Sequence, residues 1–182
     1  MAHNLRPFRQ YDEHDVVNLF AYSGDSSLVL AGKAVKVVGA GFNASSSNPI
    51  EELGSVGASF ANTVSSRYGV VGKIAPAVSG DAVIGLTLMA VRETDENGEK
   101  LVFNPRKAAE MGVVISGQSV PVLTRGIVLY SGLAAGTAGD SVYLSSSAAG
   151  DLTTSLVGSS TKVGKLLGSK DSNGFALLKI EL

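Results

Sequence analysis

The chain has 182 residues, a formal net charge of -1 and no cysteine. Its 15 lysines and arginines are scattered along the sequence, so no basic stripe of the kind that binds a phosphate backbone is visible and no nucleic-acid partner is expected. Without thiols, the fold cannot depend on disulfides or thiolate metal sites. The N-terminal residues lack an apolar signal core and no stretch approaches about 20 apolar residues, so we expect neither a secreted nor a membrane protein.

The surface of the chain is expected to be poor in charge. Only 17% of the residues are charged, against about 25% in average proteins, and the mean hydropathy is +0.24. Scattered ionic groups are what keep solitary proteins apart in solution. The composition therefore favours an oligomer or an assembly subunit, and the alternative is a Gly-rich β domain with short turns.

Residues 1–24 are predicted to form an N-terminal arm. Aromatic and charged residues are interleaved there without a clean period, and a short helix over residues 13–20, capped by Asp12, is compatible with the pattern. Such a segment either packs on its own domain or reaches a neighbouring subunit. Aromatics and arginines carry most of the energy of protein interfaces. The predicted partner-binding residues are Arg6, Phe8, Arg9, Tyr11, Phe20 and Tyr22.

Residues 25–182 are predicted to form a mainly β body, an antiparallel β-barrel or sandwich, in which two subdomains could meet near residues 91–125. The evidence is a series of Val-rich runs that Gly and Ser interrupt. The predicted strands cover residues 28–30, 34–38, 70–74, 82–92, 100–103, 113–115, 118–122, 126–130, 141–144, 162–167 and 175–181. Gly-Asp pairs at 24–25, 80–81 and 139–140 are interpreted as turns in which Asp bonds backbone amides.

Two Asn-Gly dipeptides predict hairpins, because type I′ turns need positive φ at both central residues. Asn97-Gly98 would join the strands at 82–92 and 100–103, and Asn173-Gly174 would join those at 162–167 and 175–181. The acidic tip of the first hairpin is expected in solvent, and its members are Glu93, Asp95, Glu96 and Glu99.

One short helix is predicted over residues 105–111. Asn104 can cap it, Pro105 suits its first position, and Gly112 can end it.

No motif in the sequence predicts an enzyme or a cofactor. Residues 37–44 contain G-x-G-x-x-A after a strand, but the loop that follows cannot supply the helix N-terminus that a dinucleotide needs. The Val-Gly-Lys strings at 71–73 and 163–165 lack the rest of a phosphate loop.

Histidine usage points the same way, because only His3 and His14 occur, both in the predicted arm, and no Gly-x-Ser-x-Gly elbow is present. No metal site is expected from Asp12, His14 and Asp15, because their sequential spacing does not make a closed ligand shell.

Several strings resemble virion structural proteins of tailed phages, particularly those of cyanophage-like myoviruses. The strings are residues 92–100, 104–111, 114–118, 4–14 and 173–182. The C-terminal part is similar to small β domains of capsid cement proteins in four strings: Thr124-Arg-Gly126, Gly139-Asp-Ser-Val-Tyr143, Gly150-Asp-Leu-Thr153 and Val163-Gly-Lys-Leu-Leu167.

The resemblance implies a capsid decoration or cement protein that is made in the host cytoplasm and located on the capsid surface of the virion. Its partners would be the major capsid protein and neighbouring copies, with a homotrimer favoured over a dimer and no membrane involved. The alternatives are a tail or neck component and a carbohydrate-binding adhesion module. The adhesion module requires exposed aromatics that cluster on the body.

Overall fold

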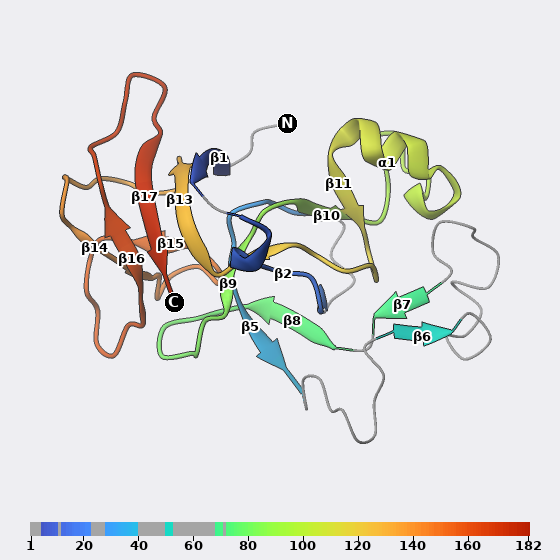
Figure 1. Ribbon diagram of the computed structural model, residues 1–182, viewed down its shortest axis with the longest axis horizontal. Helices are drawn as coiled ribbons and strands as arrows, with labels where there is room; N and C mark the ends of the chain where they lie inside the picture. Colours follow the sequence, from blue (N-terminus) through green and yellow to red (C-terminus); the bar gives the residue numbers. More distant parts are fainter. Residues whose placement is uncertain (1–4, 11, 23–27, 40–49, 53–67, 71) are drawn as a thin grey trace.

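Figure 1 shows the computed structural model of the chain, which describes residues 5–10, 12–22, 28–39, 50–52, 68–70 and 72–182. The fold is mainly β with one short α-helix, as the sequence predicts. In the described ranges the strands form two six-stranded sheets, one three-stranded sheet and one two-stranded sheet.

The first six-stranded sheet, here the C-terminal sheet, stands at the left of Figure 1. In spatial order its strands are β1 (Leu5–Gln10), β13 (Arg125–Tyr130), β17 (Ala176–Glu181), β16 (Lys162–Leu166), β14 (Ser141–Leu144) and β15 (Leu152–Thr153), and every neighbouring pair is antiparallel. β16 and β17 form the predicted hairpin around Asn173-Gly174. The Asp171 carboxylate holds its turn by accepting from the backbone N–H groups of Asn173 and Phe175.

The second six-stranded sheet, the central sheet, faces the first. Its spatial order is β2 (Val16–Val17), β12 (Val122–Leu123), β9 (Gly85–Thr87), β5 (Ala34–Val38), β8 (Lys73–Pro76) and β3 (Ala21–Tyr22). All pairs are antiparallel except β3 and β8, which run parallel. A Cβ on Gly85 would lie 2.3 Å from the Leu123 carbonyl oxygen, so only glycine fits at this position.

The three-stranded sheet carries the helix, at the upper right of Figure 1. It orders β11 (Val113–Ile115), β10 (Ala90–Arg92) and β4 (Leu28–Val29), and β10 is followed by the 3₁₀ helix η3 (Leu101–Phe103) and by α1 (Pro105–Met111). The predicted helix is confirmed, because the Asn104 side chain accepts from the Lys107 N–H and Gly112 ends it in the left-handed conformation. A separate pair consists of β6 (Ile50–Glu52) and β7 (Tyr68–Val70).

The main core lies between the two six-stranded sheets. Alternation along β13 and β17 points Val128, Tyr130 and Leu178 inward, where they cluster with Leu86 and Leu123 of the central sheet. Burial of each large apolar side chain contributes about 1.5–3 kcal/mol. Within the described residues each sheet ends in an edge strand on both sides, so the body is a sandwich and not a closed barrel.

Two predicted strands are wrong. Of the run 118–122, only Val122 lies in a strand, β12. Residues 101–103 form η3 instead of pairing with β10, and the Asn97-Gly98 turn leads only to an isolated bridge between Thr94 and Lys100. β10 is already paired on both sides, with β11 and β4, so no edge is free for another strand. Leu101 instead packs in the small core beside Ala108.

Two other predicted strands divide. The run 82–92 splits into β9 of the central sheet and β10 of the helix-lined sheet, because the Leu88 N–H donates to the Pro121 carbonyl and the chain passes from one sheet to the other. The run 70–74 splits between β7 and β8. The pattern of apolar residues continues across both breaks, so it does not reveal them.

The described part of the N-terminal segment packs on the body of its own chain. Its described residues form β1 at one edge of the C-terminal sheet and β2 and β3 at the two edges of the central sheet. Sheet edges offer unpaired backbone N–H and C=O groups to any extended segment, whatever its side-chain period. The sequence predicts that the segment either packs on its own domain or reaches a neighbouring subunit, and in the structure its described strands pack on their own domain.

Candidate interaction surface

The six residues predicted to bind partners occupy different environments. Arg6, Phe8 and Arg9 lie in β1, whose backbone pairs with β13, while Tyr11 lies outside the described residues. Leu5, which the sequence did not single out, is 4% exposed and anchors β1 in the main core. The sequence gives only a weak indication that Leu5 is buried, because a single leucine in a polar segment forms no periodic apolar pattern.

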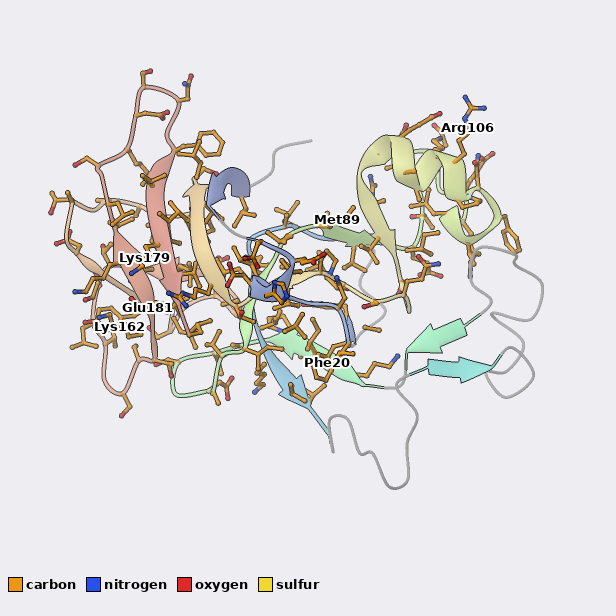
Figure 2. All side chains as sticks on the ribbon, in the orientation of Figure 1. Phe20, Met89, Arg106, Lys162, Lys179 and Glu181 are labelled. Carbon is orange, nitrogen blue, oxygen red and sulfur yellow. The ribbon has the colours of Figure 1, made fainter. Side chains whose placement is uncertain are left out.

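Tyr22 belongs to the interior, and Phe20 is half-buried beside it. Tyr22 is buried in a second core cluster with Ile74 and Val122, and burial raises the pKa of its hydroxyl to about 12. Phe20 packs against the same cluster and lies over Gly72, where a Cβ would come within 2.9 Å of its ring (Figure 2). The Tyr22 side chain is therefore enclosed by its own domain, whereas the Phe20 side chain keeps part of its surface exposed.

Asp12 caps a shorter helix than the sequence suggests. The 3₁₀ helix η1 covers only Glu13–Asp15, and its capping box joins the Asp12 and Asp15 carboxylates to backbone N–H groups. The Asp15 carbonyl accepts from both the N–H and the hydroxyl of Thr124. These bonds fix η1 to the residue that links β12 and β13. His14 is exposed beside Asp12, and among the described residues no group of three or more metal-ligating side chains occurs.

The acidic loop differs from its prediction at Asp95. The Asp95 side chain is 0% exposed, and it accepts from the backbone N–H groups of Asn97 and Glu99 and from the Lys107 ammonium of α1. The bond from Lys107 holds the pKa of Asp95 below its ordinary value, although burial acts in the opposite direction, and the same bond raises the pKa of Lys107. This carboxylate therefore fastens the loop to the helix.

The predicted Gly-Asp turns at residues 80–81 and 139–140 are both present. Asp81 accepts from the Val78 N–H at 2.7 Å, and Asp140 accepts from the Thr137 N–H at the same distance. The pKa of Asp81 is lowered by its bond with Lys36 and then by Val78, and that of Asp140 by Thr137. The pair at residues 24–25 lies outside the described residues, as do residues 40–44 of the dinucleotide-like string.

Polar contacts also join the two large sheets. Lys33, directly before β5 of the central sheet, forms an ion pair at 2.5 Å with Asp151, directly before β15 of the C-terminal sheet. The adjacent Gly150 accepts a backbone hydrogen bond from Ala34 and donates one to Ala77. These ionisable groups are engaged in holding the sandwich together, which is a structural role.

Exposed apolar side chains gather where two loops meet. Ser79 and Ser160 share a hydroxyl hydrogen bond of 3.0 Å, and Ser160 donates to the Val157 carbonyl. This contact brings Val78 close to Val157, and both are exposed, as is Leu156. The loops after β8 and β15 therefore meet, and each carries exposed apolar side chains.

Exposed aromatics do not cluster on the described body. Phe103 is 71% exposed on η3, which belongs to a different part of the fold from the half-buried Tyr143 on β14 and Phe175 before β17, and Tyr130 is buried in the core. Phe42, Phe60 and the side chain of Tyr68 lie outside the described set. The clustered platform that an adhesion module requires is not found in the described part.

Comparisons with protein-family models, curated proteins and solved structures return no match for this chain. In the described ranges, no helix is long and apolar enough to cross a membrane. Function is therefore inferred from the geometry above and from the sequence resemblance.

Proposed function

We propose that the chain is a virion structural protein that decorates and stabilises a phage capsid by binding the major capsid protein and neighbouring copies. The observation that carries the proposal is the position of the N-terminal strands. β1, β2 and β3 occupy three of the four edges of the two large sheets. β1 and β2 each have one strand partner among the described residues, whereas β3 also forms a bridge to Ser119 on its other side.

An edge strand presents a row of backbone donors and acceptors that can pair with another chain. The N-terminal segment thus offers neighbouring subunits an interface made by the backbone. Val78, Leu156 and Val157 are further exposed apolar side chains that a partner could cover. The low content of charged residues and the resemblance to virion proteins support the same role. Many copies with modest interfaces would hold a shell together by avidity.

The first test is the composition of purified particles of the phage that encodes the chain. Quantitative mass spectrometry should find the chain in a copy number that fits the symmetry of the shell, and electron cryomicroscopy should place it on the outer capsid surface. Its absence from particles would overturn the proposal, and density in the tail or neck would overturn the capsid location.

The second test concerns contact between copies. The chain has no cysteine, so an Arg6→Cys variant can form a disulfide only with another copy. On shells, mild oxidation of this variant should yield disulfide-linked dimers if the β1 edges of neighbouring copies face each other. The double variant Arg6→Cys, Leu129→Cys is the control for the pairing of β1 with its own β13, because these two residues are opposite each other in one chain. Absence of dimers for Arg6→Cys on shells would overturn the part of the proposal that assigns β1 to contacts between copies.

A further inference from the structure

The outward face of the C-terminal sheet collects cations that are far apart in the sequence. Alternation along β13, β16 and β17 points Val128, Leu166 and Leu178 into the core. The side chains that point outward on these strands include four cations: Arg125, Lys162, Lys165 and Lys179. Figure 2 shows Lys162 and Lys179 together on this sheet, remote from Arg106 on α1.

A β-bulge places two of these cations on the same face. Lys162 and Lys165 are three residues apart, so a regular strand with a period of two would point them to opposite faces. The pairing of β14 with β16 shifts register, with Val142 opposite Gly164 and Tyr143 opposite Lys162. The extra residue turns Val163 and Gly164 both inward, and both lysines remain exposed.

The positive charge on this face is poorly compensated. Arg125, Lys162 and Lys165 form no ion pair within the described residues, and Glu181, which pairs with Lys179 at 3.3 Å, is the one outward carboxylate on β13, β14, β16 and β17. Lys165 lies directly opposite Lys179 on the neighbouring strand. Like charges in that position destabilise an isolated sheet, and an anionic partner would remove the repulsion.

The remaining outward side chains indicate the kind of anion. Ile127, Leu129 and Leu177 are half-buried beside the cations, and Ile127 is opposite Lys179. A flat face that mixes aliphatic groups with lysines suits a protein surface containing carboxylates and apolar groups. A nucleic acid would be bound mainly through phosphates and by aromatic side chains on which bases stack, and Tyr143 is the one aromatic that faces outward on β13, β14, β16 and β17.

We propose that the outward face of the C-terminal sheet docks on an acidic protein surface. The inference rests on the proposed function, in which that surface belongs to the shell. Charge complementarity would fix the orientation of the chain on the shell and increase its association rate, and both effects would weaken as salt screens the charges.

The test uses the variant Lys165→Glu and the double variant Lys162→Glu, Lys165→Glu. Lys165→Glu replaces the repulsion with Lys179 by an attraction, so its melting temperature should be equal to or slightly above that of the native chain. Lys100→Glu is the matched control, because it makes the same change of charge at an exposed lysine before η3. The probes are poly-L-glutamate of about 20 residues, a DNA duplex of similar charge, and purified shells.

The native chain should bind poly-L-glutamate more tightly than DNA, and Lys165→Glu should weaken this binding at least about tenfold while Lys100→Glu leaves it unchanged. Equal or tighter binding to DNA, or equal losses in both variants, would overturn the inference. Retention of the folded double variant on shells at the native level would also overturn it and leave the proposed function standing. Binding to poly-L-glutamate without any binding to shells would instead count against the proposed function.

Discussion

At the scale of single residues, a buried carboxylate does more for this fold than the exposed ion pairs. Asp95 lies inside the loop of residues 93–99 and accepts from two backbone N–H groups as well as from Lys107. By contrast, the pair between Glu93 and Lys100 is exposed on both sides, with side-chain exposures of 42% and 58%. Exposed pairs contribute little, whereas a buried carboxylate without its partners is costly.

Replacement of Asp95 by Asn should lower the melting temperature by about 5 °C at neutral pH, because the bond between two charged groups is lost. The folded protein lowers the pKa of Asp95 from 3.8, so the pair stabilises the fold above that value. The advantage of the native chain should therefore disappear as the pH falls through the lowered pKa. Thermal melts between pH 2 and pH 7 measure this difference.

Glu93→Gln serves as the control for this experiment and should shift the melting temperature by no more than about 1 °C. A difference between the native chain and Asp95→Asn that stayed constant down to the lowest pH would show that the charge of Asp95 has no part in stability.

At the scale of secondary-structure elements, β16 depends on a glycine that its neighbour β17 approaches closely. A Cβ on Gly164 would lie 2.0 Å from the Lys179 carbonyl oxygen. The same residue is in the bulge that turns Lys162 and Lys165 to one face. The backbone geometry of this strand thus determines both its pairing and the charge of the surface.

Gly164→Ala should destabilise the protein by at least about 3 kcal/mol, because the backbone of β16 must move away from β17. Gly168→Ala is the matched control, since a Cβ there meets no atom within 4 Å and should change stability by less than about 1 kcal/mol. Urea denaturation of both variants gives the two values, and similar values for them would contradict the close approach of β16 and β17.

At the scale of the whole molecule, the two six-stranded sheets share one core. Leu86 and Leu123 of the central sheet cluster with Val128, Leu178 and Ile180 of the C-terminal sheet. The chain also crosses between the sheets where β12 leads into β13. A shared core and crossing connections make the two sheets one cooperative unit.

Leu123→Ala should therefore destabilise both sheets together, by about 2–5 kcal/mol, because it leaves a cavity between them. Amide hydrogen exchange should accelerate by similar factors at Val35 in the central sheet and at Ile180 in the C-terminal sheet. Acceleration confined to the central sheet would show that the sheets unfold separately. Leu19→Ala, at a residue that is 49% exposed, is the control and should have an effect within about 0.5 kcal/mol.

The sequence by itself determined the features that depend on neighbours along the chain. The mainly β class, the helix of residues 105–111 with its Asn104 cap, the turn at Asn173-Gly174 and the Gly-Asp turns all follow from local backbone preferences.

The tertiary structure alone decided the positions of β1, β2 and β3 at sheet edges, the burial of Asp95 against Lys107 and the assembly of a basic face from β13, β16 and β17. These features join residues through backbone pairing, a side-chain ion pair and a bulge, respectively. None of the three leaves a period in the sequence, because the partner lies elsewhere in the chain.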